Sequence, residues 1–121
     1  MHPTTSRLRS FAYALRGIAV LLTTQPNARI HAAATIAVCI AGFYFGLNMA
    51  EWCWIVLAMM AVWSAEAFNT ALEFLADAVN PDFHPLVGKA KDVAAGAVLI
   101  AAVGAVVIGV LVFGPHVLAV T

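Results

Sequence analysis

Long apolar runs alternate with short polar segments along the chain. The first run covers residues 28–48, and a tight turn separates it from the second run at 51–79. Two prolines interrupt the segment 80–91, and a third run covers 92–113. A helix of about 20 apolar residues can cross a bilayer, whereas prolines break helices. The pattern therefore predicts three membrane spans, with a loop over 80–91 between the second and the third.

Residues 5–24 show a different pattern, in which apolar side chains recur at helical spacings of three and four. These side chains are Leu8, Phe11, Leu15, Ile18 and Leu22. Arg9 and Arg16 lie on a neighbouring flank, so the segment predicts an amphipathic helix in the membrane interface. A secretory signal peptide is the alternative, because Arg7 and Arg9 precede apolar residues. Arg16 interrupts the apolar stretch, however, and no A-x-A-like cleavage site precedes the first span.

Composition narrows the class of protein. Of the 121 residues, 64% are hydrophobic and 10% are charged, which is too apolar for a water-soluble domain. The length favours a single domain over 1–121. The formal net charge is zero and the basic residues form no stripe, which argues against a nucleic-acid partner. We therefore expect an all-α membrane protein with three transmembrane helices and an N-terminal interfacial amphipathic helix.

The positions of the basic residues predict the orientation in the membrane. None lies in the first hairpin turn or after the third span; the six are Arg7, Arg9, Arg16, Arg29, Lys89 and Lys91. Basic residues are enriched on the cytoplasmic side of membrane proteins. The N-terminus and the loop over 80–91 are therefore expected in the cytoplasm, and the C-terminus on the opposite side.

A column of polar side chains runs along the second span. Its members, which we call the polar column, are Glu66, Asn69, Glu73 and Asp77. Spacings of three, four and four place them on one face of a helix. Ionisable groups inside a span are costly and usually mark function. Such groups can also serve to tie helices together through hydrogen bonds, but three carboxylates and an amide in one column favour a functional site.

The polar column reaches two depths of the membrane. From Glu66 to Asp77 it covers about 16 Å at the rise of an α-helix. We expect Glu66 at the boundary between acyl chains and head groups, and Asp77 at the level of water-soluble ligands. Lys89, Lys91 and Asp92 follow across a short loop. Lysine beside carboxylates suits a nucleoside triphosphate with its metal ion, although the lysines could also be topology anchors.

Familiar catalytic motifs are missing. Gly88 and Lys89 are followed by Ala90, so the chain has no G-x-x-x-x-G-K-[ST] loop. It also lacks H-E-x-x-H, a G-x-S-x-G elbow and a paired-cysteine zinc pattern. No usual nucleotide-binding fold fits the sequence. His31, at the start of the first span, is compatible with either a head-group anchor or a core residue.

The run from Glu66 to Glu73, E-A-F-N-T-A-L-E, followed by Asp77 and by A-K-D at 90–92, resembles the signature of the prokaryotic diacylglycerol kinase family. The H-P-L sequence at 84–86 and the H-A-A-A sequence from His31 look more like its undecaprenol kinase branch. The resemblance implies a homotrimer of the bacterial cytoplasmic (inner) membrane with sites between subunits. Its reaction would transfer the γ-phosphoryl group of ATP to a lipid alcohol, diacylglycerol or undecaprenol, with Mg²⁺.

The resemblance also implies roles for individual residues. Glu66 would be the general base, Asn69 would orient the lipid hydroxyl, and Glu73 would bind the metal. Glu66 and Ala95 would contact the lipid. The residues implied at the nucleotide are Tyr13, Arg9, Glu73, Asp77, Asp82, His84, Lys91 and Asp92.

One position departs from the family pattern. Six residues before His31 the family usually has a glutamate that helps to bind the metal, and this chain has Gln25. An amide oxygen is a neutral and weaker ligand for a hard cation. We expect either that Glu73, phosphates and water complete the coordination, or that magnesium binding or activity is altered.

Two other classes of function compete with a lipid kinase. A small proton-coupled transporter could use Glu66, because acids inside membranes often belong to proton relays. Lys89, Lys91 and the cytoplasmic carboxylates argue against it, since an exchange site would lie near the middle of the membrane. A non-catalytic assembly subunit is favoured by Gln25 alone.

Overall fold

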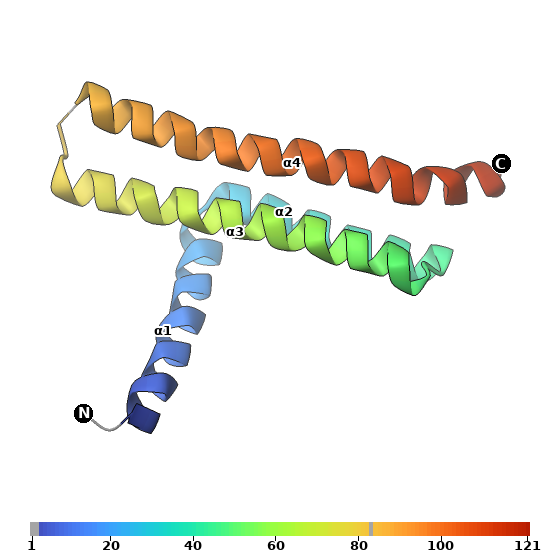
Figure 1. Ribbon diagram of the computed structural model, residues 1–121, viewed down its shortest axis with the longest axis horizontal. Helices are drawn as coiled ribbons and strands as arrows, with labels where there is room; N and C mark the ends of the chain where they lie inside the picture. Colours follow the sequence, from blue (N-terminus) through green and yellow to red (C-terminus); the bar gives the residue numbers. More distant parts are fainter. Residues whose placement is uncertain (1–2, 83) are drawn as a thin grey trace.

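Four helices make up the computed structural model, which describes residues 3–82 and 84–121. They are α1 (Pro3–Thr24), α2 (Pro26–Phe45), α3 (Met49–Val79) and α4 (Pro85–Ala119), and the described residues contain no strand. In Figure 1, α3 and α4 run side by side in opposite directions, α2 lies behind α3, and α1 leaves the bundle at a steep angle. The three helices α2, α3 and α4 are long and apolar enough to cross a membrane. The prediction of an all-α membrane protein is confirmed.

Helix α1 is amphipathic and packs little of its apolar side against the rest of the chain. Phe11 and Leu15 are exposed, whereas Leu21 near its end is buried. The helix ends at Thr24, as predicted, and Pro26 occupies the first turn of α2, where its missing N–H costs nothing. The exposed apolar side chains suit a helix that lies in the membrane interface.

The turn between α2 and α3 is fixed by its own sequence. Gly46 adopts a left-handed conformation, with φ of 66°, and ends α2 before residue 48, the expected limit of the first span. The Glu51 N–H donates to Asn48 Oδ1 at 2.9 Å, and the Asn48 N–H donates to Glu51 Oε1 at 3.0 Å. This capping box starts α3.

The link between α3 and α4 is shorter than expected. We predicted a loop over 80–91, but α4 already begins at Pro85, so residues 85–91 are helical and the predicted third span from residue 92 forms only the later part of this helix. The reason is that Pro85 occupies the first turn of a helix, which a proline favours, rather than breaking one. The Leu86 N–H donates to His84 Nδ1 at 3.1 Å and caps this start. Lys91 therefore sits on a helix.

The interior of the bundle lies between the start of α3 and the end of α4. Leu47, Ile55 and Val112 are buried there, and Phe113 packs against them. At the same end His116 Nε2 lies 2.8 Å from Glu51 Oε2. Many large apolar side chains elsewhere on α2 and α4 are exposed in the single chain. In a bilayer such surfaces face lipid or neighbouring proteins.

Candidate active site

The polar column becomes more exposed from one end to the other. Glu66 is 2% exposed, Asn69 and Glu73 are half-buried, and Asp77 is exposed. All four side chains belong to α3, a helix of 31 residues that runs past the apolar part of the bundle. One end of the column is therefore surrounded by protein and the other is open, which suits two ligands of different polarity.

At its buried end the column leaves polar atoms without hydrogen bonds. Within the described residues, Glu66 Oε2, Asn69 Oδ1 and the Thr70 hydroxyl are buried and have no hydrogen-bond partner. Burying a polar atom without such a partner is costly, and native structures contain few of them. A ligand that brings a hydroxyl group would satisfy acceptors such as Glu66 Oε2 and Asn69 Oδ1.

An ionisable neighbour of Glu66 comes from another helix. His31 Nε2, on α2, lies 3.6 Å from Glu66 Oε2. This separation is within reach of an ion pair when the imidazole is protonated but is too long for a hydrogen bond. The sequence leaves His31 open as a head-group anchor or a core residue and does not predict this contact with Glu66. The only signal was a histidine inside the first apolar run, on the span that precedes the column.

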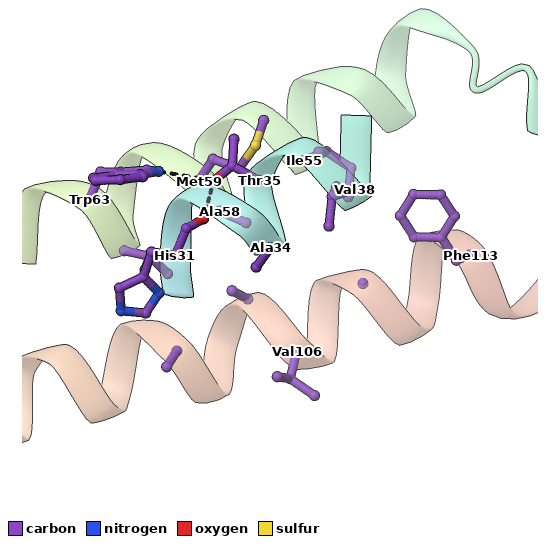
Figure 2. A pocket seen from close by; sticks show the side chains of 14 residues that line it. His31, Ala34, Thr35, Val38, Ile55, Ala58, Met59, Trp63, Val106 and Phe113 are labelled. Carbon is purple, nitrogen blue, oxygen red and sulfur yellow. Dashed lines mark hydrogen bonds between the residues drawn. The ribbon is translucent and has the colours of Figure 1, made fainter. Parts of the chain in front are cut away.

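A short chain of contacts holds His31 in place (Figure 2). The Thr35 hydroxyl donates to the His31 backbone oxygen at 2.7 Å, and Trp63 Nε1 donates to Thr35 Oγ1 at 3.0 Å. The His31 and Trp63 rings meet edge to face, with their centroids 6.3 Å apart. Trp63 lies one helical turn before Glu66, so the same contacts join α2 to the start of the polar column.

An apolar cavity of about 370 Å³ opens between α2, α3 and α4. Figure 2 shows His31 toward one end of it and Phe113 toward the other, with Val38, Ile55 and Val106 along its walls. The lining is almost entirely hydrocarbon. A cavity of this character suits a hydrocarbon chain rather than a polar ligand.

A second cavity, of about 380 Å³, lies between α1 and α3. Gly17 and Leu21 line it from α1, and Ala71 and Phe74 from α3. Thr70, 5% exposed, is the one hydroxyl in this lining. Its place one turn after Glu66 brings a further polar group to the face of the column, which the sequence analysis did not single out.

At the open end of the column the structure brings charges of both signs together. Lys91 Nζ donates to Asp77 Oδ1 at 2.6 Å, and Glu73 also acts on the Lys91 ammonium through its charge. Lys91 lies in the early turns of α4, so the helix start at Pro85 fixes its position relative to α3. A cation beside two carboxylates can bind phosphate oxygens and a metal ion together.

The other residues expected at the nucleotide or lipid lie on the surface of the single chain. Those on α1 are Arg9 and Tyr13, those in the link between α3 and α4 are Asp82 and His84, and those on α4 are Asp92 and Ala95; all six are exposed. The Tyr13 ring lies 5.3 Å from the guanidinium of Arg16. The structure thus joins Lys91 to the polar column but leaves these six on the surface.

Glu73 and Gln25 carry oxygen atoms of the kind that Mg²⁺ takes as ligands. Gln25 lies between α1 and α2, where its Nε2 donates to Thr24 Oγ1 at 3.1 Å and its side chain does not cap α2. Within the described part of the chain, no three His, Cys, Asp or Glu side chains form a metal cluster. Because Mg²⁺ at phosphoryl-transfer sites takes many of its ligands from phosphates and water, these residues fit an ion that arrives with a nucleotide.

Comparison with known proteins identifies a family and several relatives of this chain. Residues 12–113 match the family model described as prokaryotic diacylglycerol kinase. An undecaprenol kinase of Bacillus subtilis (strain 168) is 44% identical over 107 residues, which cover 88% of this chain and 87% of that protein. A diacylglycerol kinase of Synechocystis is 41% identical over 103 residues, covering 84% of this chain and 59% of that protein.

A more distant relative is also similar along nearly its whole length. The diacylglycerol kinase of Escherichia coli (strain K12) is 23% identical over 112 residues, which cover 93% of this chain and 92% of that protein. The family match extends from α1 to α4 and includes the polar column and Lys91. The chain therefore belongs to the prokaryotic diacylglycerol kinase family.

Proposed function

We propose that this protein transfers the γ-phosphoryl group of ATP to the hydroxyl of a membrane lipid alcohol, with Glu66 as the general base. The single observation that carries the proposal is the burial gradient of the polar column. At one end Glu66 is 2% exposed and has an unpaired carboxylate oxygen. At the other end Asp77 is exposed and paired with Lys91. A lipid hydroxyl and a nucleotide require these two environments, and one helix supplies both.

In the proposed reaction the lipid hydroxyl oxygen attacks the γ-phosphorus of ATP. A new P–O bond forms, the bond from the γ-phosphorus to the bridging oxygen breaks, and ADP leaves. Glu66 accepts the hydroxyl proton. The Asn69 Oδ1, buried without a hydrogen-bond partner, is suited to orient the hydroxyl. Positioning and neutralisation of charge supply most of the catalysis in phosphoryl transfer.

The nucleotide end of the site is proposed to involve both protein charge and Mg²⁺. Glu73 would hold the ion, with Gln25 as a neutral second ligand, and the ion would neutralise phosphate charge during transfer. Lys91 supplies a cation beside these carboxylates. The further residues proposed to contact the nucleotide are Arg9, Tyr13, Asp77, Asp82, His84 and Asp92.

The orientation and the assembly are also proposals. The basic residues favour a cytoplasmic N-terminus and a cytoplasmic link at 80–84, as expected for a kinase that takes ATP from the cytoplasm through the bacterial inner membrane. A homotrimer with sites between subunits would explain why six of the expected site residues are exposed in the single chain.

Two lipid alcohols are candidates for the acceptor. One relative is named undecaprenol kinase and others diacylglycerol kinase. The apolar cavity between α2, α3 and α4 offers few polar groups. Undecaprenol needs no other polar contacts than those to its hydroxyl, whereas diacylglycerol also carries two ester groups. The cavity therefore favours undecaprenol as the acceptor.

The test is a transfer assay with purified protein in detergent or lipid vesicles. ATP labelled at the γ-position and Mg²⁺ are supplied with undecaprenol, diacylglycerol or a long-chain primary alcohol. We expect labelled undecaprenyl phosphate to form faster than labelled phosphatidic acid. A higher rate with diacylglycerol would reverse the choice of acceptor, and no labelled product with any lipid would contradict the proposed function.

A further inference from the structure

The geometry points to His31 as a positioning residue that holds the Glu66 carboxylate in its reactive orientation. His31 acts through Glu66 and does not itself touch the reacting atoms. The inference rests on the proposed role of Glu66 as general base and goes beyond it, because it adds α2 to the helices of the proposed catalytic arrangement.

Both side chains of the contact between His31 and Glu66 are largely removed from solvent. Glu66 is 2% exposed, and the His31 side chain, 3.6 Å away, is 21% exposed. A carboxylate surrounded by apolar protein is costly unless a charge or a hydrogen-bond donor faces it. His31 Nε2 can provide either one, as an imidazolium or as a neutral N–H donor. A small rotation of either side chain closes the gap to a hydrogen bond.

Arg29, the other basic residue on this part of α2, makes hydrogen bonds away from Glu66. The Arg29 guanidinium donates to the backbone oxygens of Leu22 and Thr23, at 3.1 and 2.7 Å, and so caps the end of α1. On the side of α4, the cavity next to His31 is lined by alanine, valine, glycine and phenylalanine. Among the described residues, neither α2 nor the facing wall of α4 thus brings a cation that would compete with His31 for the Glu66 carboxylate.

Contacts with Trp63 and Thr35 hold the ring and the backbone of His31, respectively. Its backbone is fixed by Thr35, and its ring meets the edge of Trp63, which is hydrogen-bonded to Thr35. A ring fixed in this way restricts Glu66 to the rotamers that keep Oε2 toward α2. Because a carboxylate oxygen has two lone pairs, Oε2 can face His31 Nε2 and still accept a hydrogen bond from the lipid hydroxyl. Orientation of this kind contributes to rate without contributing to substrate binding.

The kinetic test compares His31→Ala and His31→Gln with wild-type protein. We expect His31→Ala to lower kcat on the order of 10- to 100-fold, the scale of a misplaced reacting group, while KM for ATP changes little. His31→Gln, whose Nε2 can donate to Glu66, should recover much of the lost rate. An equal loss in both variants, or a rise in KM without a fall in kcat, would overturn the inference.

His116→Ala is the matched control. His116 is the other histidine paired with a glutamate of α3, and it contacts Glu51 at 2.8 Å at the far end of the bundle. Loss of this pair should reduce thermal stability but leave kcat within about twofold, because orientation effects act only on reacting groups. If His116→Ala and His31→Ala lowered kcat equally, the effect of His31 would be structural and the inference would fall.

A double-mutant cycle in thermal stability tests the contact independently of turnover. His31→Ala should lower the Tm in detergent, because it leaves the Glu66 carboxylate buried alone, and His31→Ala/Glu66→Gln should recover most of the loss. Additive effects would show that the two residues do not interact and would overturn the inference. If the cycle shows coupling but wild-type protein phosphorylates no lipid, the proposed function fails while the contact stands.

Discussion

Single residues of the polar column occupy different environments although they share one helix. Glu66 is buried next to His31, whereas Asp77 is exposed and paired with Lys91 at 2.6 Å. Between them lie Asn69 and Glu73, both half-buried. The chemistry proposed for each residue follows from its depth, because a general base for a lipid hydroxyl must lie near the lipid and phosphate ligands must lie near water.

Gln25→Glu tests the weakest ligand in the proposed metal site. A carboxylate binds a hard cation more strongly than an amide oxygen. The substitution should therefore lower the Mg²⁺ concentration at half-maximal activity, measured by titrating Mg²⁺ at saturating ATP. Gln25→Asn, which keeps an amide, serves as the control. An identical Mg²⁺ dependence in Gln25→Glu and wild-type protein would remove Gln25 from the metal site.

Lys91→Ala tests the nucleotide end of the column. Removing the ammonium should raise KM for ATP about tenfold, the scale of one charge-assisted contact, with a smaller effect on KM for the lipid. Lys89→Ala is the matched control, because Lys89 is exposed and lies two residues earlier on the same helix. A KM for ATP that stays at the wild-type value in both variants would argue that both lysines only anchor the topology.

Sequence spacing alone predicted the polar column, because residues on one helix keep their relative positions whatever surrounds them. It also placed Lys91 across a short link from Asp77, and the structure pairs them. The contact of His31 with Glu66 could not be predicted in this way. It depends on how α2 is aligned along α3, and that alignment is set by the packing of many interchangeable apolar side chains.

At the scale of helices, the ends are set by local signals. Gly46 ends α2, Asn48 and Glu51 start α3 with a capping box, and His84 with Pro85 starts α4. The apolar runs predicted the existence and order of the helices but not these limits. Pro85 was misjudged because a proline both interrupts a helix and favours its first turn, and only the backbone on either side distinguishes the two cases.

Asn48→Ala tests the capping box at the α2–α3 turn. Loss of the side-chain acceptor for the Glu51 N–H should lower the free energy of unfolding by about 0.5–2 kcal/mol, measured by denaturant titration in mixed micelles. Asn48→Asp keeps an acceptor and should retain most of the stability. Activity at saturating substrates should stay close to wild type in both variants. The turn lies at the start of α3, whereas Asp77 lies near the other end of that helix. Unchanged stability in Asn48→Ala would show that the box contributes nothing.

At the scale of the whole molecule, the single chain leaves much apolar surface exposed. Large side chains along α2 and α4, such as Ile36 and Ile100, are exposed. At Gly96 and Gly104 an added Cβ would meet no other described part of the chain within 4 Å beyond its own helix turn. Lipid or a neighbouring subunit must cover these surfaces, and small residues allow close approach of helices in membranes. We predict a homotrimer, in which neighbouring subunits would cover part of these surfaces.

Mixing inactive subunits tests whether sites form between chains. Arg9 is exposed on α1, the helix that leaves the bundle at a steep angle (Figure 1), whereas Glu66 is buried on α3. We expect the Arg9→Ala protein and the Glu66→Gln protein each to have reduced activity when assayed alone. Unfolding and refolding them together should restore activity above the sum of the two, because some sites would then receive intact Arg9 and Glu66 from different subunits. Activity equal to that sum would place each site within one chain.

The central claim is that Glu66 removes the proton from a lipid hydroxyl at the buried end of the polar column. The most direct test measures transfer of labelled phosphate to lipid and equilibrium binding of ATP in wild-type and Glu66→Gln proteins side by side. Glutamine keeps the size of the side chain but cannot accept the proton as a carboxylate does. The account predicts that Glu66→Gln loses turnover and keeps ATP affinity. Phosphorylation at the wild-type rate by Glu66→Gln would contradict it.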